Sequence, residues 1–106
     1  NKLATILFAD IVDSTALVEE AEGDEALDLL RGALEAMGAC IAQAGGTINR
    51  VMGDGVMALF GAPRSQEDHA LAACLAARAM LAAVAARFPA LRLRVGVHSG
   101  DFIVHA

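Results

Sequence analysis

Aromatic side chains are nearly missing from this chain of 106 residues, which has no tryptophan, no tyrosine and four phenylalanines. This scarcity disfavours an aromatic-rich β-sandwich. Hydrophobic residues still make up 57% of the sequence, and alanine is abundant among them. A chain of this length can bury one sizeable core, so we predict a single domain over residues 1–106 in which helices pack closely on a small sheet.

Cysteine and positive charge are also scarce. Cys40 and Cys74 lie in alanine-rich stretches without CxxC spacing, so we predict two small buried residues rather than a disulfide or a zinc site. Lysine and arginine together number 8 and are scattered, and the formal net charge is -5. Because affinity for nucleic acid depends on clustered cations, this composition argues against a nucleic-acid partner. It is compatible with a small anionic substrate in a cleft that gathers local cations or metal ions.

Uninterrupted hydrophobic runs are short. Arg78, Arg87 and several glycines divide the longest of them, so the sequence offers no span of about 20 apolar residues fit to cross a bilayer. A secretory signal with a basic and then an apolar region is missing as well. We therefore expect a cytoplasmic location and no membrane segment. The chain opens directly into a strand, as an excised domain would.

The first half of the sequence alternates between apolar segments and glycine-rich breaks. Leu3–Ala9 is an apolar run typical of a buried central strand, and it places Asp10 at the C-terminal end of that strand. From Asp24 to Ala44 apolar residues recur at steps of three and four, which predicts an amphipathic helix. Two strands joined by a tight Asp-Gly turn are then predicted at Thr47–Met52 and Val56–Phe60.

The second half predicts one more helix and two more strands. Ser65, with Asp68 three residues later, indicates a capped helix start, and the helix is predicted to continue to Arg87. The order β, α, β, β, α, β, β resembles a ferredoxin-like split βαβ core with both helices on one face of the sheet. We therefore assign the chain to the α+β class. The last two strands are predicted at Leu91–His98 and Phe102–Val104, with a turn between them.

Two acidic residues occupy positions that this topology brings together. Asp10 ends the first strand and Asp54 lies in the hairpin turn, and a split βαβ sheet places that strand beside the hairpin. Two converging carboxylates together with substrate phosphates suit Mg²⁺ or Mn²⁺, which prefer oxygen ligands. Asp13, Ser14 and Thr15 follow at a predicted helix N-terminus, where backbone N–H groups can hold phosphate oxygens or the side chains can simply cap the helix. The pattern suits phosphoryl or nucleotidyl transfer.

Three segments resemble the successive signature segments of class III adenylyl and guanylyl cyclases. They are Phe8–Thr15, Asn49–Ala58 and Leu93–Gly100, in the same order and at suitable separations. Each segment alone would be a modest indication, whereas the combination is specific. The resemblance covers the chain from its first strand to its last, and it implies a cyclase catalytic domain that is cut short at its C-terminal side.

The resemblance also implies roles for individual residues. Asp10 and Asp54 would hold two ions of Mg²⁺ or Mn²⁺, with the carbonyl group of Ile11 as a further ligand. The loop Val12–Thr15 would meet the triphosphate, and Arg94 would direct its guanidinium at the phosphates. The implied reaction converts ATP to 3′,5′-cyclic AMP and pyrophosphate by a two-metal mechanism.

Arg50 departs from the family pattern, because adenylyl cyclases usually carry a purine-selecting lysine four residues before the second metal aspartate. Arginine can still donate a hydrogen bond to adenine, but its planar guanidinium is larger than an ammonium group. GTP is therefore the alternative substrate. The glutamate typical of guanylyl cyclases does not stand at this position, which favours ATP.

Family members usually continue beyond the position of Ala106, with a further purine-contacting residue and an Asn and Arg pair that stabilise the transition state. They also form their active sites between two catalytic domains. The resemblance therefore implies a homodimer with a composite active site. We expect the 106-residue chain by itself to be weakly active or inactive.

Two alternatives stay open at this stage. A strand that ends in aspartate also resembles the nucleophile segment of haloacid-dehalogenase-like phosphatases, but Asp10 and Asp13 are three residues apart rather than two. The expected parallel, doubly wound order is missing as well. The second alternative is a degenerate cyclase-like module that binds nucleotide or dimerises without catalysis, which the truncation and Arg50 would both allow.

Overall fold

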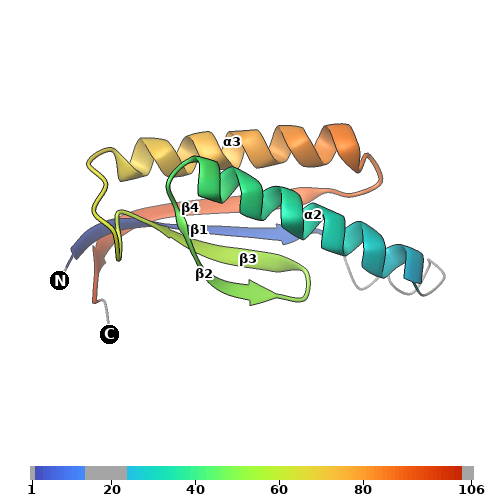
Figure 1. Cartoon of the computed structure of the whole chain (residues 1–106), viewed down its shortest axis with the longest axis horizontal. Helices are drawn as coiled ribbons and strands as arrows, with labels where there is room; N and C mark the ends of the chain where they lie inside the picture. Colours follow the sequence, from blue (N-terminus) through green and yellow to red (C-terminus); the bar gives the residue numbers. More distant parts are fainter. Residues whose placement is uncertain (1, 14–23, 104–106) are drawn as a thin grey trace.

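The computed structural model describes residues 2–13 and 24–103. The four strands form one antiparallel sheet in the order β2-β3-β1-β4, and both helices cover the same face of it (Figure 1). Strands β1 and β2 run parallel with β3 between them, which confirms the predicted α+β fold with a split βαβ core. The elements are β1 (Lys2–Ile11), α2 (Asp24–Gln43), β2 (Thr47–Met52), β3 (Gly55–Phe60), α3 (His69–Arg87) and β4 (Leu93–Phe102).

The direction of the strands decides one of the alternatives. Each pair of neighbouring strands in the described sheet is antiparallel. A haloacid-dehalogenase-like phosphatase requires a parallel, doubly wound sheet. This alternative is therefore dropped.

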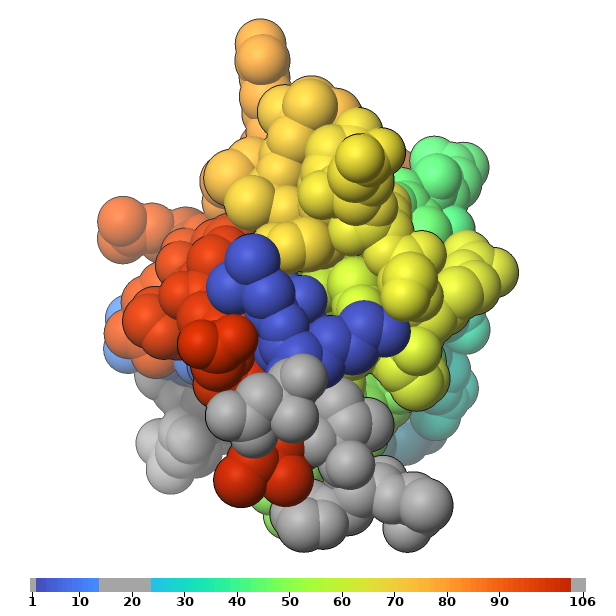
Figure 2. Space-filling model, turned by 90° about the vertical axis from the view of Figure 1, so that its left-hand side faces the viewer, coloured from blue at the N-terminus to red at the C-terminus, as the bar shows by residue number. Residues whose placement is uncertain are grey.

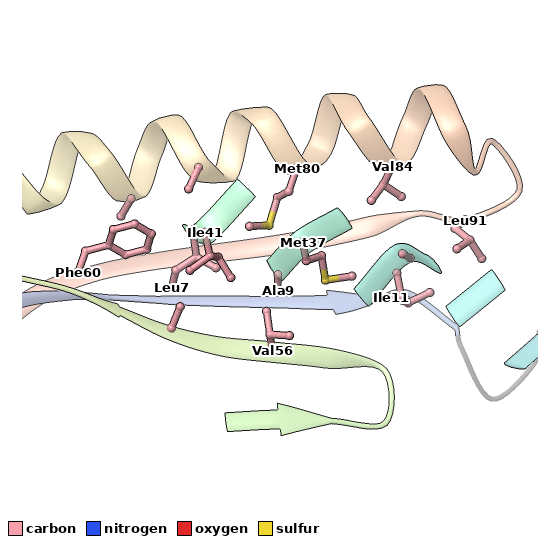
Figure 3. Packing of buried hydrophobic residues seen from close by; sticks show 14 of the residues in the cluster. Leu7, Ala9, Ile11, Met37, Ile41, Val56, Phe60, Met80, Val84 and Leu91 are labelled. Atoms are coloured by element: carbon pink, nitrogen blue, oxygen red, sulfur yellow. The ribbon is translucent and has the colours of Figure 1, made fainter. Parts of the chain in front are cut away.

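The hydrophobic core lies between the sheet and the helices (Figure 3). Leu7 of β1, Phe60 of β3, Met37 of α2 and Met80 of α3 are each fully buried in this layer. Burial of such a side chain contributes about 1.5–3 kcal/mol to stability, so these four anchor the helices to the sheet. Buried alanines between them keep the helices close to the strands: Ala9, Ala33, Ala58, Ala73 and Ala76.

The opposite face of the sheet has no helix over it among the described residues (Figure 1). Four apolar side chains of β1 and β3 are at least partly exposed on this face, because they alternate along these strands with residues of the core. Phe8 is the most exposed of them, at 49%. We call this surface the open face, and its four residues are Ile6, Phe8, Met57 and Leu59.

The C-terminal part of the chain corrects one prediction. Strands were expected at Leu91–His98 and Phe102–Val104 with a turn between them, whereas β4 is continuous across the expected turn. The reason is that β1 offers a partner for each residue there, including Thr5 for Ser99. A long central strand therefore overrides a local Ser-Gly-Asp turn signal. Val104 itself lies outside the described residues.

The start of α3 corrects a second prediction. The helix begins at His69 and follows Asp68, whose side chain makes no capping hydrogen bond, so the predicted capping pair of Ser65 and Asp68 is wrong. The hydroxyl group of Ser65 instead accepts a hydrogen bond of 3.1 Å from Nζ of Lys2. Figure 2 shows the result: the beginning of β1 lies between the end of β4 and the segment that precedes α3.

Helix α3 is more apolar than was predicted from the sequence. By length and composition this helix is apolar enough to cross a membrane, which was not expected from the sequence. In the structure it lies along the sheet, with Ala73, Met80 and Val84 in the core. Cys74 is exposed, so the prediction of a buried residue is wrong there, while Cys40 is half-buried; both cysteines are free.

A buried polar contact joins the central strand to α3 and β4. Thr5 is fully buried in β1, and its hydroxyl oxygen lies 2.7 Å from Nδ1 of His69 and 2.7 Å from the hydroxyl oxygen of Ser99. The hydroxyl group of threonine has one proton and two lone pairs, so Thr5 donates at most one of these hydrogen bonds and accepts at least one. The contact ties the first residue of α3 to two neighbouring strands.

Replacement of Thr5 by valine is expected to lower the free energy of unfolding by about 1–2 kcal/mol, because it removes both hydrogen bonds and leaves Nδ1 of the half-buried His69 without this partner. The shape of the side chain is kept, so only the lost hydrogen bonds can account for a decrease. Urea denaturation of the protein measures the effect. Thr47→Val at an exposed position of β2 is the matched control, expected to change stability by less than about 0.5 kcal/mol. Equal stability of the two variants would contradict the role of Thr5.

Candidate active site

One row of residues crosses the sheet where β1 ends. Strand pairing places Gly55 of β3 and Arg94 of β4 opposite Asp10 of β1, and Met52 of β2 opposite Gly55. Figure 1 shows the tip of β1, the β2–β3 turn and the beginning of β4 at the same end of the sheet. Directly paired residues point to the same face, so Asp10 and Arg94 lie on the side of the sheet that carries the open face.

The turn that carries Asp54 is held against the tip of β1. The backbone N–H of Ile11 donates a hydrogen bond of 2.9 Å to the carbonyl oxygen of Asp54. A Cβ atom on Gly55 would overlap the carbonyl oxygen of Ala9 and lie 3.0 Å from Cβ of Asp10. Gly55 is the first residue of β3. Glycine is needed here because β3 and β1 approach closely, in addition to any requirement of the turn. The two aspartates therefore lie on adjoining segments, as the sequence predicted.

Arg94 and Asp10 form a forked ion pair. Nε of Arg94 donates to one carboxylate oxygen of Asp10 and Nη2 donates to the other, each at 3.1 Å. The arginine side chain is 72% exposed and the aspartate side chain 39% exposed. These hydrogen bonds, and the negative charge of Asp10, raise the pKa of Arg94 above the ordinary value of arginine.

Three carboxylates act on the same guanidinium. The charges of Asp13 and Asp54 also raise the pKa of Arg94, in addition to the larger effect of Asp10. Asp13 has a positive φ of 56°, a backbone conformation that aspartate adopts more readily than most residues. The acidic groups at the tip of β1 and in the β2–β3 turn thus all act on Arg94, and Asp10 is the one that contacts it directly.

These residues fit a pair of hard divalent cations that share their coordination with a substrate. Among residues 2–13 and 24–103, no three His, Cys, Asp or Glu side chains gather to form a metal cage. Mg²⁺ is commonly bound through one or two carboxylates, with waters and substrate phosphates as the other ligands, so two aspartates are enough. The forked contact with Arg94 shows that the carboxylate of Asp10 already accommodates a cationic group.

Arg50 lies on the strand of the sheet farthest from Arg94. It is exposed on β2 opposite Met57, which in turn lies opposite Phe8, so two strands separate Arg50 from β4. The register of β2 shifts between Ile48 and Arg50. This bulge leaves Asn49 as an extra residue beside Arg50 and could not be foreseen from the sequence. The structure therefore brings Asp10, Asp54 and Arg94 together, and places Arg50 beside the open face.

The predicted phosphate loop is only partly described. Val12 is half-buried, and its backbone N–H donates to the carbonyl oxygen of Arg92 at 2.8 Å, so this group is already used within the protein. Asp13 is exposed. Ser14 and Thr15, which were predicted to contact phosphates, lie outside the described residues.

Comparisons with known proteins agree with this arrangement. The whole chain, residues 1–106, matches the family described as the adenylate and guanylate cyclase catalytic domain. It is 32% identical to adenylate cyclase 1 of Rhizobium meliloti, over 94% of this chain and 16% of that protein. Among solved structures, it is similar to the adenylyl cyclase CyaB from P. aeruginosa, with 34% identity, a TM-score of 0.84, and coverage of 93% of this chain and 56% of that chain.

A guanylyl cyclase is equally similar in sequence. The chain is 34% identical to the guanylyl cyclase Cya2, with a TM-score of 0.75, over 93% of this chain and 54% of that chain. The chain thus spans just over half of each of these two solved chains and 16% of the curated relative. The comparisons agree on the kind of domain and leave the choice between ATP and GTP to the site itself.

Proposed function

The chain belongs to the family of adenylate and guanylate cyclase catalytic domains, and we propose from this that its parent protein converts ATP to 3′,5′-cyclic AMP and pyrophosphate. The observation that carries the proposal is the position of Asp10, Asp54 and Arg94 at one end of the sheet. Two carboxylates can hold the metal ions of a metal-bound triphosphate, and a neighbouring arginine can bind its phosphates. Nothing in the proposed reaction needs a nucleophilic side chain.

Each residue has a distinct part in the proposed reaction. Asp10 and Asp54 would hold two ions of Mg²⁺ or Mn²⁺ through their carboxylates, and Ile11 would add its carbonyl oxygen. When bound, the ions would activate the ribose 3′-hydroxyl group and neutralise the charge on the leaving pyrophosphate. Arg94 would bind phosphate oxygens through its planar fork, which favours one orientation of the triphosphate. Val12 begins the loop, Val12–Thr15, that we propose lies along the phosphates.

Arg50 is proposed to contact the purine base. It is an exposed donor beside the apolar open face, where Phe8 and Met57 can pack against a flat ring or a partner surface. The glutamate expected for guanine recognition does not stand at this position, and two of the similar proteins described above are adenylate cyclases. ATP is therefore the proposed substrate, with GTP as the competitor to be tested.

A homodimer is proposed to complete the site. The open face exposes apolar side chains next to Asp10 and Arg94, so a second copy packed against this face would exclude water from the reacting phosphates. A cytoplasmic location stays a prediction from the sequence. Whether the domain is a catalyst or a regulatory nucleotide-binding module is decided by product formation.

Measurement of cyclic nucleotide and pyrophosphate tests the proposal directly. The full-length parent protein, given equal ATP and GTP with Mn²⁺, is expected to form cyclic AMP at least about tenfold faster than cyclic GMP, a difference that one or two base-specific hydrogen bonds can supply. The 106-residue chain in the same assay is expected to form little or no product. Nucleotide binding without pyrophosphate release by the parent protein would instead identify a non-catalytic module. Rapid synthesis of cyclic AMP by the 106-residue chain, lost on Asp54→Ala, would show that the expectation for the short chain is wrong.

A further inference from the structure

The ion pair between Arg94 and Asp10 engages both residues at their functional ends. The guanidinium uses two of its nitrogen atoms, and each carboxylate oxygen of Asp10 accepts one hydrogen bond. Asp10 is also one of the two aspartates assigned to the metal ions, and Arg94 is the arginine assigned to the phosphates. The two assigned partners of the substrate complex are therefore bound to each other in the protein without ligands.

A divalent ion and the guanidinium compete for the same oxygens. A metal ion bonded to Asp10 would take at least one oxygen that now accepts a hydrogen bond from Arg94, and the two positive charges would repel each other at this short range. The contact is exposed to solvent, so its exchange for another partner is not opposed by burial. Arg94 can leave Asp10 by rotation of its long side chain while β4 stays paired with β1.

We propose that Arg94 is the internal counter-cation of Asp10, which a divalent ion must displace, and that the displaced guanidinium becomes free to bind the triphosphate. Arg94 is in this sense a positioning residue that couples the two binding events. The inference rests on the proposed function. Asp13, which is not assigned to the metal ions, also places negative charge near Arg94 and favours a position of the guanidinium close to the site after it leaves Asp10.

The proposal predicts opposite signs for two affinities. Loss of the guanidinium removes the competitor for Asp10, so the nucleotide-free protein should bind a metal ion more tightly. The same change removes a ligand of the phosphates, so the metal-loaded protein should bind nucleotide more weakly. A residue that served only as a phosphate ligand, or only as part of the strand, would leave the affinity for the metal ion unchanged.

Binding of Mn²⁺ alone to the parent protein, without nucleotide, provides the test. Free Mn²⁺ is measured by its paramagnetic resonance signal, and the affinity is confirmed by calorimetry. Arg94→Gln is expected to bind Mn²⁺ about twofold to fivefold more tightly than the wild type, the range that removal of one exposed charge partner can produce. The matched control is Arg92→Gln, which removes the same charge from an exposed position next to β4 and keeps the backbone contact to Val12.

A double substitution identifies the carboxylate concerned. In protein that already carries Asp10→Asn, Arg94→Gln should no longer tighten Mn²⁺ binding, because the competitor and the ligand have been removed together. Unchanged or weaker Mn²⁺ binding by Arg94→Gln, or an equal gain in Arg92→Gln, would overturn the inference. If the wild type binds Mn²⁺ and Asp54→Asn abolishes this binding, either of these Arg94→Gln or Arg92→Gln results removes this inference and leaves the proposed function in place. If the wild type binds no Mn²⁺, both are wrong.

Discussion

Exchange of Asp54 for asparagine is expected to lower the rate of cyclic-nucleotide formation by the parent protein about a thousandfold, and exchange of Asp10 for asparagine should do the same. Asparagine keeps the size of the side chain and removes its charge, so each change removes a proposed metal ligand and alters packing little. A loss of several kcal/mol of charge stabilisation in the transition state corresponds to this factor. Initial rates at saturating ATP and Mn²⁺ measure it.

The matched control for these changes is Asp101→Asn. Asp101 is an exposed residue of β4 that pairs with Leu3 at the other end of the sheet, so the same chemical change occurs away from the site. Its activity should stay within about twofold of the wild type, the scale expected for a surface substitution. Thermal unfolding of all three variants shows whether the fold is kept. Activity of Asp54→Asn close to that of Asp101→Asn would refute a catalytic role for the carboxylate pair.

Replacement of Gly55 by alanine should have the second large effect, on both stability and activity. The added methyl group would overlap the carbonyl oxygen of Ala9, which is backbone and cannot rotate away, so β3 and β1 must move apart. Such overpacking typically costs about 1–3 kcal/mol. The displaced atoms include those of Asp10 and Asp54, and a displacement of about 1 Å at a reacting centre can reduce the rate about a hundredfold. Urea denaturation and the cyclase assay measure the two effects separately.

Gly53→Ala provides the control for Gly55→Ala. Gly53 lies two residues earlier in the same turn, a Cβ atom there would meet no other atom within 4 Å, and its φ is not in the left-handed region. Stability of this variant should change by less than about 0.5 kcal/mol. The comparison distinguishes the need for close approach at Gly55 from a general need for flexible glycines in the turn. Similar losses in both variants would show that the turn conformation, and not the contact with Ala9, is the cause.

Local patterns in the sequence were sufficient where an element depends on its own residues. The apolar run that ends at Asp10, the helical spacing after Asp24 and the Asp-Gly turn each predicted an element that the structure contains. Predictions were wrong where a distant strand decides the outcome. The Ser-Gly-Asp segment near Ser99 was expected to turn, but Thr5 and its neighbours on β1 pair with it as a strand.

The candidate site shows the same limit. Sequence spacing predicted that Asp10 and Asp54 approach each other, because the topology of a split βαβ sheet places their segments together. It could not predict that Arg94 stands directly opposite Asp10, since this depends on the register between β1 and β4. The bulge beside Arg50 and the steric role of Gly55 likewise depend on pairs of strands. A single sequence without register information contains no signal for these contacts.

The position of β4 at the border of the sheet affects how the protein must be handled. Within the described part of the chain, β4 pairs with β1 along one side only, so its other side presents a row of backbone donors and acceptors to solvent over a strand of 10 residues. Such a border is a template for addition of a strand from another molecule. The other border strand, β2, is shorter and carries a bulge, so aggregation of the isolated domain at high concentration would begin most readily along β4, and a pairing segment supplied there would suppress it.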